Sequence, residues 1–193
     1  MMRELRIAAV AAVALTIVLG LAYPLAMTGV SRVAFPNKSD GSVVERDGKA
    51  VGSTRIGQDF SKNPGYFQGR PSVTDYNPSG SAFNNQGPNQ KDLGDQLKGY
   101  VADYLKREKP FTPSLTAAQV PVDAVTTSAS GVDPDISEAN ARIQANRVAR
   151  ERGLPLERVL QIVEDHASRP MFGLAGPKSI NVLEANLALD QLS

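Results

Sequence analysis

An uncharged apolar run near the N-terminus constrains this chain more than any other feature. From Ile7 to Val30 there is no charged residue. As a helix rising about 1.5 Å per residue, the run can cross the roughly 30 Å hydrocarbon core of a bilayer. A cleaved secretory signal is the alternative, but its apolar region runs to about 15 residues, and no clear small-x-small cleavage pattern follows here. We therefore predict a transmembrane helix over residues 7–30, preceded by an N-terminal flank over residues 1–6.

Three residues within this run favour contact with a neighbouring helix. Gly20 and Ala26 are small enough to allow close helix packing in lipid. Pro24 lacks a backbone N–H and must disturb the local helix shape. Ala-rich spans also occur without a partner, so we treat Gly20, Pro24 and Ala26 as candidate contact residues.

Charge gives only a mild indication of orientation. Arg3 and Arg6 precede the run, while Arg32 and Lys38 follow it, so the counts of flanking basic residues are equal. The basic N-terminal flank resembles that of a signal anchor. This favours a cytoplasmic N-terminus, with residues 31–193 outside the cytoplasm in a cell (inner) membrane protein that spans the bilayer once.

Composition excludes several classes of function. The chain has 21 basic and 20 acidic residues, and this balance gives no indication of nucleic-acid binding. It has no cysteine, which excludes disulfides and thiolate metal sites. Its one histidine, His166, is more consistent with a solvated helix end than with a metal ligand, so we expect no metal site.

Residues 31–193 show a mixed pattern of strands and helices. Asp47-Gly48 between two β-prone runs predicts a hairpin, and the apolar spacing from Gln90 to Lys109 predicts an amphipathic helix. Val120, Val122 and Val125 are expected to face the core.

Ser137 and Gly153 are suited to begin and end another helix. Pro155 can start the next, and a short strand and a final helix are expected near the C-terminus. The expected fold is a single α+β (or mixed α/β) extracytoplasmic domain following a single N-terminal transmembrane helix.

The stretch from residue 61 to residue 90 is crowded with Gly, Pro, Asn and Ser, which predicts a long loop. It also carries Tyr66, Phe67, Tyr76 and Phe83. These aromatic side chains either fix the loop to its own domain or contact a partner. Both interpretations stay open, with Tyr66 and Phe67 as candidate partner contacts.

Several segments, in order and over nearly the whole chain, resemble the C chain of the potassium-importing Kdp ATPase. They are AYPLAMTGV, GSTRIGQDF, YFQGRPS, YNPSGSAFNNQGPNQ, VTTSASGVDPDIS, IQANRVARERG and INVLEANLALDQL. The resemblance implies a non-catalytic accessory subunit of a P-type ATPase complex. Its partners would be a channel-like A chain, an ATP-hydrolysing B chain and a small single-span F chain, together with membrane lipid. It also implies a role in assembly and in raising the affinity of the pump for ATP.

The proposed ATP role directs attention to two segments. Ser128, Ser130, Gly131 and Asp133 loosely resemble a serine-glycine signature whose hydroxyls and glycine amide can bind phosphate. Gln144 matches a glutamine that the family links to nucleotide binding. The alternative is a Ser/Gly turn before an Asp-Pro helix start, with Gln144 on the solvated face of the helix. We favour this alternative because an extracytoplasmic domain would not meet ATP.

Other chemistry finds little support in the sequence. GLAGPKS, residues 173–179, has the lysine and serine of a phosphate loop, but Pro177 removes a backbone N–H that the loop needs. The single histidine has no recognisable nucleophile partner. We therefore expect no catalytic residues and no cofactor held by this chain, although the complex would use ATP and potassium. The alternative function is a membrane-anchored extracytoplasmic module that captures a small ligand through its aromatic-rich loop.

Overall fold

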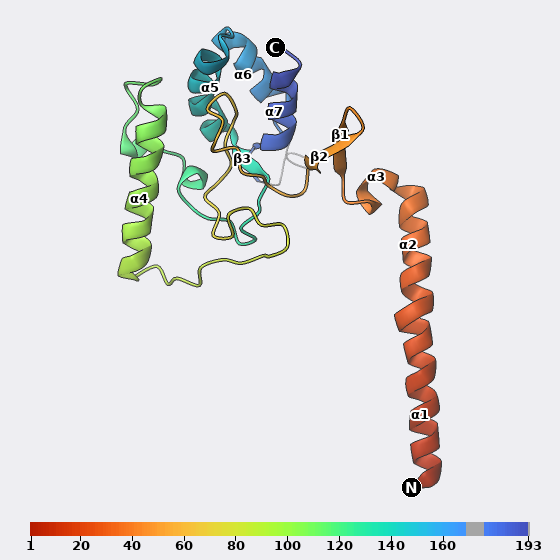
Figure 1. The fold of residues 1–193 in the computed structure, drawn as a ribbon. Coiled ribbons are helices and arrows are strands. Elements are labelled where there is room, and N and C mark those ends of the chain that lie inside the picture. Colours follow the sequence, from red (N-terminus) through yellow and green to blue (C-terminus); the bar gives the residue numbers. More distant parts are fainter. Residues whose placement is uncertain (169–175, 193) are drawn as a thin grey trace. The chain divides into compact units, whose positions relative to one another are not determined.

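The computed structural model describes residues 1–168 and 176–192, which belong to two separate units, residues 1–51 and 52–193. The first unit begins with one long helix (Figure 1). It comprises α1 (Met2–Ile17), a π-helical turn (Val18–Ala22) and α2 (Tyr23–Ala34). The 18-residue segment of this helix with the highest mean hydropathy has no buried residue. Among the described residues, it is the one helix long and apolar enough to cross a membrane. It extends beyond the predicted span at both ends.

The π-helical turn lies directly before Pro24, and the proline explains it. Pro24 has no N–H, so the carbonyl of Gly20 loses its α-helical donor. The helix responds with a wider turn, in which the Tyr23 N–H donates to the Val18 carbonyl five residues back. Normal α-helix resumes at Tyr23, and the Thr28 hydroxyl donates to the Pro24 carbonyl over 2.8 Å.

A short helix and a hairpin follow the apolar helix. Helix α3 (Pro36–Ser39) leads into β1 (Val43–Arg46) and β2 (Lys49–Ser53), which pair with each other. Asp47 and Gly48 form the two-residue turn with φ of 52° and 72°. Positive φ at both positions matches the twist of a β-hairpin. The predicted hairpin is therefore confirmed.

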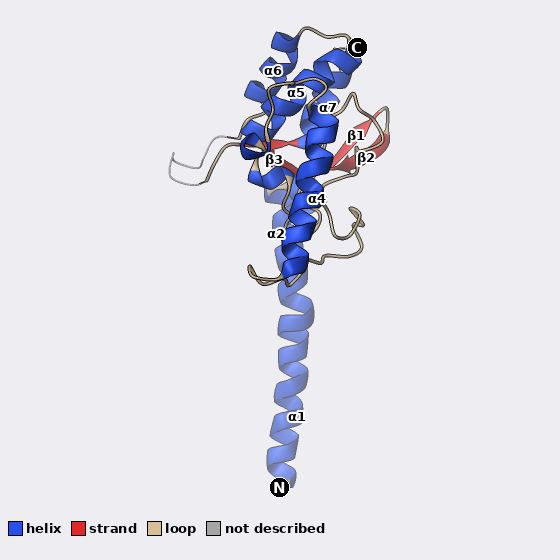
Figure 2. Cartoon of the chain, turned by 90° about the vertical axis from the view of Figure 1, so that its left-hand side faces the viewer, coloured by secondary structure: helices blue, strands red, loops and turns tan. Residues whose placement is uncertain are grey.

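The second unit combines helices with one small sheet (Figure 2). Its elements are α4 (Lys91–Glu108), the 3₁₀ turns η2 (Ala117–Gln119) and η3 (Val122–Ala124), β3 (Asp135–Ser137), α5 (Glu138–Arg152), α6 (Leu156–Asp165), β4 (Ser179–Asn181) and α7 (Val182–Asp190). The long loop between β2 and α4 is described throughout and contains no helix or strand, as predicted for residues 61–90. The mixed α and β content is also as expected.

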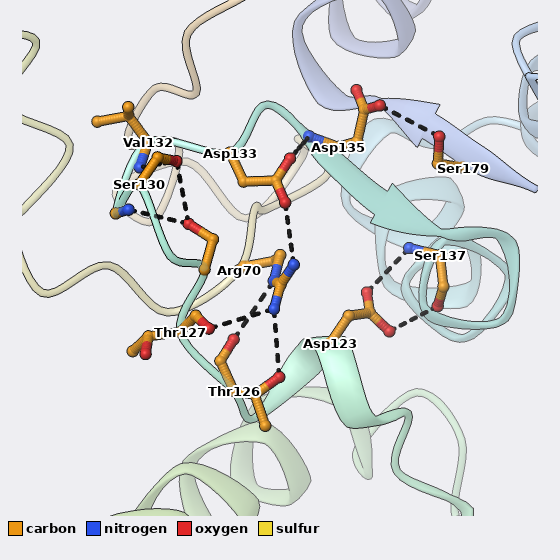
Figure 3. Close-up of polar contacts among 12 residues, drawn as sticks. Arg70, Asp123, Thr126, Thr127, Ser130, Val132, Asp133, Asp135, Ser137 and Ser179 are labelled. Atoms are coloured by element: carbon orange, nitrogen blue, oxygen red, sulfur yellow. Dashed lines mark hydrogen bonds and ion pairs between the residues drawn. The ribbon is translucent and has the colours of Figure 1, made fainter. Parts of the chain in front are cut away.

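Local signals place α5 where the sequence predicted it. The Ser137 hydroxyl accepts a hydrogen bond from the Asn140 N–H at the start of the helix. Gly153 ends it in the left-handed conformation, with φ of 66°. Asp123, on η3, strengthens the same N-terminus by accepting hydrogen bonds from the backbone N–H and the hydroxyl of Ser137 (Figure 3).

The main core lies where α5, α6 and α7 meet the antiparallel pair β3–β4. Ile136 and Ile180 face each other across the pair and are almost fully buried. Burial of such a side chain stabilises a fold by about 1.5–3 kcal/mol. The core also takes in Phe67 from the long loop, so this loop is part of the folded body.

A smaller core cluster joins α4 to the segment before β3. It contains Tyr104, Leu115 and Ala124, with Val120 and Val125 packed against them. The prediction that Val122 faces the core is wrong, since 74% of this residue is exposed. Val122 begins the 3₁₀ turn η3, whose tight winding directs Ala124 inward instead.

Candidate functional site

The Ser/Gly segment forms a closed turn. The Gly131 N–H donates to the Ser128 hydroxyl over 3.0 Å, and the Val132 N–H donates to the Ser130 hydroxyl over 3.2 Å. Gly131 adopts φ of +73°, and a Cβ atom there would lie 2.9 Å from the Ala82 carbonyl. The hydroxyls and the glycine amide that a phosphate would need are therefore used within the turn and packed against the long loop.

Asp133 is held by Arg70, which comes from the long loop. The Arg70 Nη1 atom lies 2.9 Å from Asp133 Oδ2, and the same guanidinium donates to the Thr127 carbonyl and the Thr126 hydroxyl (Figure 3). The other carboxylate oxygen of Asp133 accepts the Asp135 N–H. This ion pair fixes the loop to the chain leading into β3, and no local pattern in the sequence indicates this role of Arg70.

Gln144 lies in the interior and has no exposed surface. Its Oε1 accepts from the Gln68 N–H and from Arg147, and its Nε2 donates to the Gln68 carbonyl and to Asn140. The expectation that Gln144 faces solvent is wrong. Helix α5 is covered on most of its circumference, which its polar sequence does not suggest. The structure thus separates Gln144 from the surface and gives it four internal partners.

Gln144 belongs to a set of side chains that hold residues 64–68 in place. The side-chain amide of Asn186 bonds the N–H and the carbonyl of Phe67, at 2.8 and 3.0 Å. Arg147 donates to the carbonyls of Pro64 and Tyr66. These contacts satisfy the backbone groups of a buried segment that has no strand partner.

A buried ion pair joins α4 to α5. Arg147 Nε lies 3.1 Å from Glu108 Oε1, and both side chains are almost completely buried. Burial lowers the pKa of Arg147, although the adjacent Glu108 carboxylate opposes this shift. Arg107 also contacts Glu108, at 2.7 Å, so two guanidinium groups share one carboxylate.

Two tyrosines in this region are strongly perturbed by burial. Burial, with the carboxylates of Asp59 and Asp133 as further causes, raises the pKa of Tyr76 to about 12. The pKa of Tyr104 is raised as well, mainly by burial and then by Glu108. The Tyr104 hydroxyl donates to Asn140 over 2.9 Å. Both phenols are therefore neutral hydrogen-bonding groups rather than acids at physiological pH.

A cavity of about 300 Å³ opens beside these tyrosines. One wall comes from the long loop and the other from α4, with Ala124 of η3 at one side. Gln68 and Arg107 both line it, as do several aromatic rings and carboxylates. The cavity lies within the second unit and was not foreseen, because residues far apart in sequence form it.

The aromatic residues of the loop differ in position. Phe67 is fully buried in the main core. Tyr66 packs edge-on against Phe60, lies under the Arg152 guanidinium and donates to Asp190. Both therefore contribute to their own domain, as one of the two interpretations expected. Phe83 is more than half exposed and stays available for other contacts.

The remaining candidates fall elsewhere. Gly20, Pro24 and Ala26 lie at the π-helical turn and the start of α2, and all three are exposed. His166 ends α6, where its Nδ1 lies 2.9 Å from the Ile162 carbonyl. No group of three or more His, Cys, Asp or Glu residues suited to a metal ion occurs in the described parts of the chain. Residues 173–175 of the GLAGPKS segment lie outside the described residues, while Lys178 pairs with Glu138.

The chain is similar to known proteins over nearly its full length. A family model described as K+-transporting ATPase, c chain, matches residues 5–191. A potassium-transporting ATPase KdpC subunit of Rhodopseudomonas palustris strain BisB18 is 48% identical, over 98% of this chain and 98% of the relative. The KdpC subunit of Polaromonas naphthalenivorans is 51% identical, over 92% of this chain and 89% of the relative. The KdpC subunit of Caulobacter vibrioides is 47% identical, over 98% of this chain and 94% of the relative.

Proposed function

Because the chain belongs to the family of the K+-transporting ATPase c chains, the KdpC subunits, we propose that it is a non-catalytic accessory subunit of a high-affinity, ATP-driven potassium import complex. The observation that carries the proposal is the full-length match to subunits of such a pump, together with one unburied apolar helix joined to a separate folded unit. A helix that exposes its apolar side chains all round must be covered by lipid or by other helices.

The proposed partners are the other chains of the pump: the channel-like A chain, the ATP-hydrolysing B chain and the small single-span F chain. The subunit would serve the assembly and stability of this complex. We place its first contact at Gly20, Pro24 and Ala26, since small residues let a second helix approach closely in lipid. The pi-helical turn supports this choice, because it widens the helix at the same position.

We further propose a cytoplasmic N-terminus, residues 7–30 in the bilayer and residues 31–193 outside the cytoplasm. In this orientation the folded unit never meets ATP. The burial of Gln144 and the closed Ser/Gly turn support the same conclusion, since neither offers free groups to a phosphate. An effect of this subunit on ATP binding by the catalytic chain would then pass through the assembled complex and not through direct contact with the nucleotide.

Topology can be tested with single cysteines, because the natural chain has none. Ser79→Cys lies in the exposed loop and should react with a membrane-impermeant thiol reagent in intact cells. Met2→Cys, at the exposed start of α1, should react only after lysis. The reverse pattern would show that the folded unit is cytoplasmic, and direct contact with ATP would then have to be reconsidered.

Membership of the complex is tested by purification in mild detergent. A tagged copy of the chain should recover the pore-forming and ATP-hydrolysing chains in fixed proportion. Its removal should abolish growth on low potassium. Recovery of the tagged chain alone, with normal growth of the deletion strain, would contradict the proposal and favour an independent binding module.

A further inference from the structure

The cavity between the long loop and α4 is partly open to solvent, and it combines opposite charges, an amide and aromatic rings. Its volume of about 300 Å³ is at the small end of the range for small-molecule sites. We propose that it binds a small zwitterion of the amino-acid class. The ligand's ammonium lies at Asp103, and its carboxylate lies at Arg107 and the Gln68 amide.

Gln68 gives the first reason to expect a ligand. Only 6% of this residue is exposed, and its backbone N–H and carbonyl are both bonded to Gln144. Its side-chain amide has no hydrogen-bond partner among the described residues, and Gln68 borders the cavity. Among the described side chains only Thr112 Oγ1 is buried without a partner, so the Gln68 amide is open to the cavity. A ligand with donors and acceptors can replace the water that this amide would otherwise bind.

Arg107 supplies the positive charge. Its Nε donates to Glu108, and its guanidinium lies 5.1 Å from the centre of the Tyr104 ring. Glu108 also pairs with the buried Arg147, so one carboxylate balances two guanidinium groups. The terminal nitrogens of Arg107 carry no hydrogen bond in the described chain, and one third of the side chain is exposed. They are free to bind a carboxylate.

Asp103 supplies the negative charge on the same face of α4. It lies one helical turn before Arg107, a spacing at which Asp and Arg side chains can pair. Here Arg107 turns to Glu108 instead, and Asp103 has no ion pair within the described residues. The Cβ atoms of Asp103 and Arg107 are about 5–6 Å apart by helix geometry. This suits an ammonium and a carboxylate carried by one carbon.

The rest of the lining selects against other ligands. Tyr76, Tyr100, Tyr104 and Phe60 offer ring surfaces to an apolar side chain. The carboxylates of Asp59 and Asp75 also line the cavity and would repel a polyphosphate. A ligand with no net charge and an apolar body satisfies both sets of groups.

The test is calorimetric titration of the full chain in detergent with L-leucine, which has a free ammonium, a free carboxylate and an apolar body. N-acetyl-L-leucine lacks the ammonium, and L-leucinamide lacks the carboxylate. We expect L-leucine to bind and each blocked compound to bind about tenfold more weakly or worse, since each loses a charge-assisted hydrogen bond.

Variants assign the binding to the cavity. Asp103→Asn should weaken L-leucine binding about tenfold and remove the preference over the N-acetyl compound. Gln68→Met should also weaken binding, with an unchanged melting temperature, because the amide it removes has no partner among the residues that the structure describes. Asp92→Asn, an exposed carboxylate on the same helix outside the cavity, is the matched control and should bind as the natural chain does.

Three results would overturn the proposal. One is the absence of L-leucine binding tighter than about 10 mM in a chain that melts normally. Another is equal binding of L-leucine by Asp103→Asn and the natural chain. The third is binding of ATP that Asp103→Asn strengthens, which would assign the cavity to a polyphosphate.

Discussion

Gln144 has four hydrogen bonds inside the protein, and its surroundings leave no room for a ligand. Two of these bonds go to the backbone of Gln68. The residue therefore acts on the structure of the long loop, and its removal changes the cavity and the core together. A functional effect of altering it is expected to arise through folding.

We predict that Gln144→Ala lowers the free energy of unfolding by about 3 kcal/mol, because several buried polar groups lose their partner. For a chain of this size the melting temperature should fall by roughly 6–12 °C. Thermal unfolding of the full chain in detergent measures this. Gln161→Ala is the control, since Gln161 is exposed and bonds only Asp165 on its own helix. A variant that melts normally but weakens ATP binding by the pump would contradict the structural role.

A second prediction at the scale of single residues concerns the buried ion pair of Glu108. This residue is fully buried between two arginines. Glu108→Gln leaves Arg147 charged and unpaired in the interior, and breaking such a pair costs about 3–5 kcal/mol. We expect a larger loss of stability in denaturant unfolding than for Glu151→Gln, an exposed carboxylate on α5. Equal midpoints for the two variants would show that the ion pair contributes nothing to stability.

At the scale of elements, the loop depends on close approaches that only glycine permits. The Gly57 N–H donates to the Val132 carbonyl over 2.8 Å, which joins the start of the loop to the Ser/Gly turn. A Cβ atom on Gly57 would lie 2.5 Å from the Asp133 carbonyl and 2.9 Å from the Tyr76 ring. The backbone at Asp133 cannot move without disturbing the Arg70 ion pair.

Gly57→Ala should therefore destabilise the second unit by about 1–3 kcal/mol, the usual cost of inserting a methyl group into a packed site. Protease digestion of the loop, followed over time, is the measurement, and the variant should be cut faster. Gly80→Ala is the matched control in the same loop, because its Cβ would meet nothing within 4 Å. Similar digestion rates for both variants would contradict the packing argument.

Helix boundaries were predictable because their signals are local. Ser137 and Gly153 mark the ends of α5 within the sequence, and Pro24 marks the irregular turn of the apolar helix. The cavity and the buried network were not predictable in this way. They depend on pairs such as Phe67 with Asn186, 119 positions apart, and nothing in the composition of α5 indicates that Arg147 is buried. The polar sequence of α5 gives no indication that this helix lies at the centre of the core.

At the scale of the whole molecule, we predict that Gly20→Leu with Ala26→Leu leaves membrane insertion intact but reduces recovery of the pump complex and growth on low potassium. Added side chains hold helices apart and lose many dispersion contacts at once. The control is Ala9→Leu with Ala12→Leu, which adds the same bulk to α1 away from the π-helical turn. Normal recovery and growth in the first pair would place the assembly contact on the folded unit, with Phe83 as the first exposed aromatic to test.

The bonds from residues 64–68 to the side chains of α5 and α7 also determine when the chain can fold. Phe67 finds its partner at Asn186, 119 positions further along the chain. Closing so long a loop costs entropy and slows folding. Synthesis proceeds from the N-terminus, so this part of the core stays incomplete until Asn186 has been added. Until then residues 64–68 lack their native partners, and a chain that has not completed its fold is the form that can be threaded through a narrow channel across a membrane.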